Sequence, residues 1–122
     1  MSCAINVVGG GIGGLSFALA IRRARRDVLV RVFEKNDMRN EHKKAVHIGL
    51  WSPALRALSL LDVYPKIANE FEPVMKSCYM DSTGCILAQP ARQLGMPDRK
   101  FESPSLMFVR EDTLMQTLRE VC

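Results

Sequence analysis

The hydrophobic pattern of the chain begins with two short apolar runs that flank a longer apolar stretch of helical spacing. Residues 4–8 and 29–33 are rich in β-branched and apolar side chains, which predicts two strands. Residues 12–21 are apolar at helical spacing and run into an arginine-rich segment, which predicts a helix that ends there. The order strand, helix, strand predicts a βαβ unit.

The middle of the chain predicts two further helical segments after a polar loop at residues 35–44. Ser52 followed by Pro53 is a typical helix start, with the serine as N-cap and the proline at the first helical position. Leu55, Leu58 and Leu61 follow at helical spacing, so one face of this helix belongs to the core. Another amphipathic stretch covers residues 64–71.

The last third of the chain predicts a hairpin, a loop, a strand and a helix. Residues 74–80 and 85–88 read as strands around a turn in which Gly84 supplies a positive φ angle. Residues 89–104 contain three prolines and read as a loop. Residues 105–109 form the next strand, and a helix starts at Glu111 with Leu114 and Leu118 on its buried face.

The turn between the first strand and the first helix carries a G-x-G-x-x-G motif, formed by Gly9, Gly11 and Gly14. The first glycine permits the tight turn, the second lets the backbone approach a pyrophosphate, and the third lets the helix pack closely on the strand. The amide groups of Ile12, Gly13 and Gly14 open the helix, whose positive end favours phosphate. An ordinary structural βαβ turn is the alternative interpretation.

A carboxylate completes the motif at the end of the second strand. Glu34 lies twenty residues after Gly14, where an acid can accept hydrogen bonds from the ribose hydroxyls of a dinucleotide. An acid here disfavours the 2′-phosphate of NADP as the resident dinucleotide, whereas FAD and NAD both remain open.

Composition limits the function classes. The chain suits one small domain, and its 48% hydrophobic and 25% charged residues are those of a globular protein. The arginines at 22, 23, 25 and 26 complement the negative end of the first helix, and no aromatic residues accompany them, so nucleic acid is not an expected partner. The cysteine and histidine spacing predicts no metal site and reduced thiols.

Residues 2–21 contain no charged side chain, which raises the question of a membrane span or signal peptide. The glycine turn divides this stretch into a strand and a helix, and the arginines follow the apolar part. We therefore expect a soluble protein of the cytoplasm or an organelle lumen or stroma, with no signal peptide evident and membrane insertion unlikely.

Five separated segments together resemble single-component FAD-dependent monooxygenases of the para-hydroxybenzoate hydroxylase group (group A). They are the glycine motif, the strand end at residues 32–35, residues 48–58, the turn at residues 81–84, and residues 109–118. Residues 17–20 and 33–35 look most like the zeaxanthin epoxidase and salicylate hydroxylase branch. The resemblance runs through essentially the whole chain.

The resemblance implies an α/β fold in which a Rossmann-like βαβ FAD-binding domain receives an inserted β-sheet substrate domain. Residues 1–72 would be the FAD-binding βαβ part, residues 73–104 the start of the substrate-domain sheet, and residues 105–122 an incomplete return to the FAD-binding domain. The family's downstream Gly-Asp flavin motif is absent from the chain. The resemblance therefore implies the truncated N-terminal portion of a longer enzyme, with catalytic residues beyond residue 122.

The resemblance also implies roles for individual residues. Gly9, Gly11, Ile12, Gly13 and Gly14 would bind the cofactor through the glycine loop. Glu34 would hold the adenosine ribose, Lys35 would lie beside the adenine, and Arg110 would reach the pyrophosphate and ribityl part of FAD. Lys35 as a solvated cation and Arg110 as a partner of its acidic neighbours are the alternatives.

The implied activity is NAD(P)H-dependent hydroxylation or epoxidation of an aromatic or olefinic small molecule with O2, through a flavin C4a-hydroperoxide. FAD would be the cofactor and NAD(P)H the co-substrate. Two other functions remain open: an NAD-dependent or other flavin oxidoreductase that uses the same motif, and a truncated non-catalytic FAD-fold fragment.

Overall fold

The computed structural model describes residues 3–35, 46–89 and 106–122. It begins with the predicted βαβ unit: strand β1 (Ala4–Val8), helix α1 (Ile12–Ala24) and strand β2 (Leu29–Phe33). β1 and β2 pair in parallel, with Val7 opposite Val32 and Val8 opposite Phe33. The predicted loops at residues 35–44 and 89–104 lie outside the described residues, apart from Lys35 and Gln89.

A second, antiparallel sheet has the strand order β3-β7-β4. It joins β3 (His47–Trp51) to β7 (Leu106–Arg110), with the two-residue strand β4 (Glu72–Pro73) on the other side of β7. The helical elements on this side are α2 (Ser52–Leu60), α3 (Tyr64–Ile67), the 3₁₀ turn η1 (Ala68–Glu70) and α4 (Glu111–Val121).

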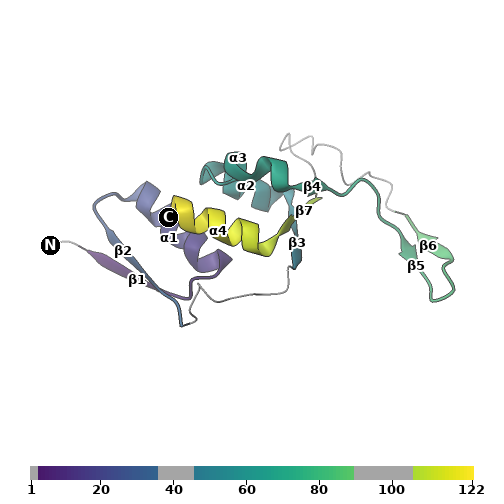
Figure 1. Cartoon of the computed structure of the whole chain (residues 1–122), viewed down its shortest axis with the longest axis horizontal. Coiled ribbons are helices and arrows are strands. Elements are labelled where there is room, and N and C mark those ends of the chain that lie inside the picture. The colour runs from purple at the N-terminus through teal and green to yellow at the C-terminus, as the bar shows by residue number, and fades with distance from the viewer. Residues whose placement is uncertain (1–2, 36–45, 90–105) are drawn as a thin grey trace.

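The predicted hairpin is present but shorter than expected. β5 (Tyr79–Met80) pairs with β6 (Ile86–Ala88), and residues 74–78 are not in a strand. Gly84 has φ +89°, as the turn requires. The hairpin extends away from the rest of the molecule (Figure 1).

The predicted start of α2 is wrong by one residue. Trp51 is the N-cap, and no side chain caps the helix. The reason is that β3 runs directly into α2: Trp51 is both the last strand residue and, with extended backbone (φ −79°, ψ 160°), the first cap position. Ser52 is instead a buried residue of the first turn.

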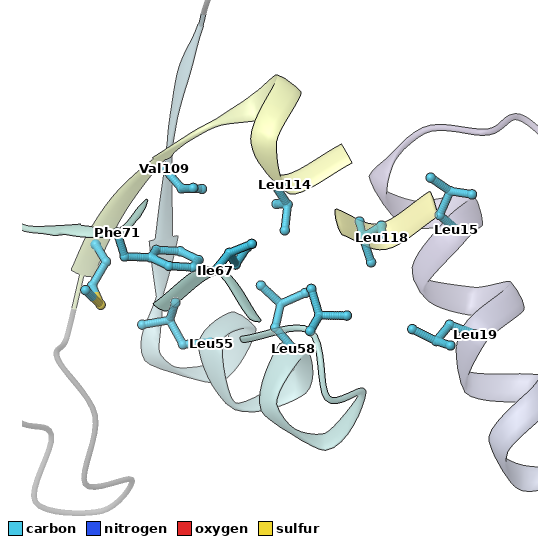
Figure 2. Close-up of a cluster of buried hydrophobic side chains, with 11 residues drawn as sticks. Leu15, Leu19, Leu55, Leu58, Ile67, Phe71, Val109, Leu114 and Leu118 are labelled. Atoms are coloured by element: carbon cyan, nitrogen blue, oxygen red, sulfur yellow. The ribbon is translucent and has the colours of Figure 1, made fainter. Parts of the chain in front are cut away.

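The core lies between α1, α2 and α4. Leu114 and Leu118 of α4 are fully buried, and Figure 2 shows Leu118 between Leu15 of α1 and Leu58 of α2. Leu55, Leu58, Leu114 and Leu118 were all predicted on buried faces, and the structure confirms them. The remaining members of the cluster come from the same helices, the segment after α2, and β7: Leu19, Val63, Ile67, Phe71, Met107 and Val109.

The β1-β2 sheet has one packed face and one open face. Alternate residues such as Val7 and Val32 are directed to the α1 side, where Val7 is buried. On the other face Val8 is 88% exposed, and Leu29 and Phe33 are each about half exposed. Parallel sheets are normally covered on both faces, so this open apolar face is unusual.

Candidate dinucleotide site

The glycine loop is fixed to the end of the parallel sheet. Gly9 follows β1 with φ +102°, a left-handed conformation that favours glycine. Its N–H donates a hydrogen bond of 2.7 Å to the carbonyl oxygen of Phe33, the last residue of β2. The turn out of β1 therefore lies beside the end of β2.

Gly14 and Gly11 differ in what surrounds them. A Cβ atom on Gly14 would collide with the carbonyl oxygen of Gly9, so the first turn of α1 packs directly on the backbone of the loop. A Cβ atom on Gly11 or Gly13 would meet nothing within 4 Å. The space in front of the loop is open to a ligand, as the motif predicts.

The first turn of α1 carries no acid of its own. Gly11 is its N-cap, no side chain caps it, and its first turn contains no acidic residue. The first amide groups of a helix have no intrahelical acceptor, and the helix dipole places partial positive charge there. The start of α1 is thus suited to a phosphate group.

Glu34 lies against this loop. Its Oε2 accepts a hydrogen bond of 2.7 Å from the N–H of Gly10. A Cβ atom on Gly10 would stand 3.1 Å from the Cβ of Glu34, so a larger residue would press on the acid. Gly10 was not among the predicted site residues. Its place between Gly9 and Gly11 in an unbroken run of three glycines could have indicated it.

Lys35 and Arg110 occupy different surroundings. Lys35 follows Glu34 and is exposed, and its place beside an adenine stays a prediction. Arg110 is the last residue of β7 and the N-cap of α4. Its guanidinium forms a two-pronged ion pair with Asp112, Nε to Oδ1 at 3.1 Å and a terminal nitrogen to Oδ2 at 2.6 Å.

The Arg110 to Asp112 pair is about half exposed to solvent and shifts the titration of its carboxylate. The guanidinium of Arg110 lowers the pKa of Asp112 from 3.8 to about 2, with help from the N–H of Thr113. Pairing with an acidic neighbour is the alternative role that the sequence analysis gave for Arg110. A phosphate would have to replace Asp112 as the partner of the same planar group.

α1 and α4 run in the same direction side by side (Figure 1). Their C-terminal ends border one groove, which is lined by Arg22 and Arg23 of α1 and by Val121 of α4. Their N-terminal ends, which carry the glycine loop and Arg110, therefore face the opposite end of the molecule. Both helix dipoles direct their positive ends to that side.

Other chemistry is sparse in the described part of the chain. No group of three or more histidine, cysteine, aspartate or glutamate side chains could hold a metal ion there. All four cysteines are free thiols. None of the helices within the described ranges has the length and apolar character needed to cross a membrane.

Comparison with known proteins supports the fold. Residues 7–38 match the family model of an NAD(P)-binding Rossmann-like domain. No curated protein sequence matches the chain. Among solved structures, p-nitrophenol 4-monooxygenase PnpA from Pseudomonas putida superposes with a TM-score of 0.76 at 21% identity, over 98% of this chain and 29% of that one.

Two further structures give the same picture. HpxO from Klebsiella pneumoniae, solved with FAD and uric acid, has a TM-score of 0.72 at 23% identity, over 97% of this chain and 28% of its own. The tetrameric form of 2-methyl-3-hydroxypyridine-5-carboxylic acid oxygenase has a TM-score of 0.75 at 18% identity, over 98% of this chain and 29% of its own. The chain thus has the α/β fold of one part of these oxygenases, with a Rossmann-like βαβ unit, and spans less than a third of their length.

Proposed function

We propose that this chain is the FAD-binding part of an NAD(P)H-dependent flavoprotein monooxygenase of the para-hydroxybenzoate hydroxylase group. The observation that carries the proposal is the extent of the structural match, which covers 97–98% of the chain in PnpA and HpxO. A match of this extent takes in the β3-β7-β4 sheet and the β5-β6 hairpin as well as the βαβ unit. The proposed substrate is a small aromatic or olefinic molecule, oxidised with O2.

The residues at the end of the β1-β2 sheet fit a dinucleotide. The open space at Gly11 and Gly13 leaves room for a pyrophosphate at the start of α1. Glu34, already beside the loop, would accept the ribose hydroxyls, and Lys35 would lie near the adenine. Arg110 would exchange Asp112 for the phosphate and ribityl part of the cofactor.

In such an enzyme the protein positions the cofactor and excludes water from it. FAD, when bound, supplies the redox chemistry between NAD(P)H, O2 and the substrate. The glycine loop would neutralise the pyrophosphate with backbone amides and the helix dipole, and Glu34 would fix the orientation of the adenosine half. We propose residues 1–72 and 105–122 as the cofactor-binding part and residues 73–104 as the start of the substrate domain.

A second candidate is an NAD-dependent oxidoreductase. The family model that matches residues 7–38 describes NAD(P) binding, and the ADP moiety is common to NAD and FAD. The two candidates differ in the rest of the chain, because a plain NAD domain has no role for Arg110 at the start of α4.

Calorimetric titration of the chain with ADP, FAD and FMN tests the nucleotide site. We expect the isolated chain to bind ADP and FAD only weakly, because it contains the adenosine half of the site alone, and not to bind FMN, which lacks that half. Gly11→Ala should abolish binding without loss of fold, because its Cβ contacts no protein atom. Glu34→Ala should weaken binding about tenfold to a hundredfold, for two hydrogen bonds worth roughly 0.5–1.5 kcal/mol each.

The matched control is Glu72→Ala, which removes an exposed carboxylate outside the site. Equal affinities in the Glu34 and Glu72 variants would contradict the assignment.

The absorption spectrum of the protein, purified as it is expressed in its natural cells, distinguishes a bound flavin from a bound nicotinamide. A flavin spectrum supports the monooxygenase proposal, and a bound nicotinamide without flavin supports the second candidate.

A further inference from the structure

A second polar site lies at the end of α1 that is remote from the glycine loop. It is an open groove of about 660 Å³, within the range of small-molecule sites. Its walls come from the end of α1, the segment that leads to β2, the turn after α2, and the end of α4. Its polar lining residues are Arg22, Arg23, Arg25, Arg26 and Asp62, and its apolar ones are Leu19, Val28 and Val121.

The arginines of this groove are unequally paired. Arg23 forms an ion pair of 2.7 Å with Asp62, and Arg25 forms a two-pronged pair with Asp27. Arg22 and Arg26 have no ion pair with any described residue, and both are exposed. The groove therefore keeps uncompensated positive charge.

Complementing the helix dipole explains only part of this arrangement. The dipole effect fades within the last turn of a helix, which accounts for Arg22 and Arg23 but not for Arg26, which follows the end of α1. Asp62 adds a second observation. It has φ +50°, the left-handed conformation that glycine usually adopts just after the end of a helix. Its carboxylate pairs with Arg23 in the wall of the groove.

We propose that this groove binds a small phosphate-bearing anion. Arg22 and Arg26 are its direct ligands, because a guanidinium group pairs with phosphate through two parallel hydrogen bonds. The carboxylate of Asp62 competes with the anion for Arg23, which lines the facing wall. The site is separate from the proposed nucleotide site, since the glycine loop is at the other end of α1.

Pyrophosphate is the probe, titrated calorimetrically into the chain at constant ionic strength. Arg22→Gln with Arg26→Gln should weaken binding at least tenfold. The matched control, Arg31→Gln with Lys76→Gln, removes the same charge from exposed positions outside the groove and should retain the affinity. Asp62→Asn should strengthen binding several-fold, because it frees Arg23 while asparagine tolerates the positive φ angle.

The Asp62→Asn variant keeps the test decisive even if the double arginine variant is unstable, because loss of fold cannot increase affinity. Equal weakening in the arginine variant and its control would overturn the proposal, as would unchanged or weaker binding by Asp62→Asn. Gly11→Ala distinguishes the two anion sites. If Gly11→Ala alone removes all pyrophosphate binding, the groove is not a binding site. If acidic peptides bind the groove more tightly than pyrophosphate does, the proposed ligand class is wrong.

Discussion

Two neighbouring glycines at the start of α1 have opposite structural requirements. A Cβ on Gly14 would collide with the Gly9 carbonyl oxygen, whereas one on Gly13 would meet no atom within 4 Å. Gly14→Ala should therefore lower the free energy of unfolding by about 1–3 kcal/mol. Gly13→Ala should raise it by up to about 1 kcal/mol, because alanine favours the helix. Chemical denaturation measures both, and equal effects would contradict the close packing at Gly14.

The ion pair between Arg110 and Asp112 makes stability depend on pH in an acidic range. The folded-state pKa of Asp112 is about 2, below its ordinary 3.8, so its stabilising contribution is complete above about pH 4 and is lost as the pH falls toward 2. In Arg110→Gln, the pKa of Asp112 should rise most of the way to 3.8. NMR titration of the carboxylates measures it.

Asp27 is the internal control for that titration. Its pKa is lowered by a different arginine, Arg25, so it should be unchanged in Arg110→Gln. A general shift of both carboxylates would show that the substitution altered the fold, and an unchanged pKa of Asp112 would show that Arg110 is not its partner in solution.

At the residue scale, the sequence predicted the backbone of the glycine loop because Gly9 and Gly14 each have a local conformational or packing reason. The conformation of Gly9 and the close packing at Gly14 agree with those reasons. The partner of Arg110 was harder to predict. Asp112 is only two residues away, but whether a side chain turns to its neighbour or to a ligand depends on surroundings that the sequence does not contain.

The C-terminal end of α2 is stabilised both by backbone hydrogen bonds and by a side-chain ion pair. The N–H of Val63 bonds to the carbonyl of Leu58 at 2.9 Å, and that of Asp62 to the carbonyl of Ser59 at 3.0 Å, which is a Schellman motif. Asp62 occupies the left-handed position of this motif, and its side chain reaches Arg23 on α1.

Substituting Asp62 separates these two contributions. Asp62→Gly and Asp62→Ala both remove the ion pair, but only alanine is strained at φ +50°. Asp62→Ala should therefore be less stable than Asp62→Gly by about 1 kcal/mol. Thermal and denaturant unfolding give this difference directly. If the two variants were equally stable, the left-handed conformation would not persist in solution.

Elements held by distant partners were the least predictable. No strand was predicted at residues 47–51, because β3 is defined by its pairing with β7, which is about sixty residues away. The hairpin strands were predicted too long because residues 74–78 have a strand-like composition but pair with no described strand. Val74 makes one backbone hydrogen bond to Leu106 of β7, and the ladder goes no further. By contrast α1 and α4 have strong helical periodicity, and their predicted positions are confirmed.

On the scale of the whole molecule, α4 joins the βαβ unit to the rest of the fold. Leu118 is fully buried between α1 and α2 (Figure 2). Leu118→Ala should cost about 2–5 kcal/mol, which is a large share of the stability of a small domain. Leu60→Ala, at a position 70% exposed, should change stability by less than about 0.5 kcal/mol. Comparable losses in the two variants would mean that the core is not packed as described.

The open face of the β1-β2 sheet has a consequence for how the candidate site behaves in time. Both strands pair only with each other among the described strands, and only one of their faces is packed. Local opening needs least free energy where few apolar contacts must be broken, so amide hydrogens of β1 and β2 should exchange with solvent faster than those of α4. The glycine loop and Glu34 stand at the ends of these strands, so a nucleotide would bind only the closed population and should slow their exchange selectively. Hydrogen exchange with and without ADP measures this, and uniform protection of all elements would contradict it.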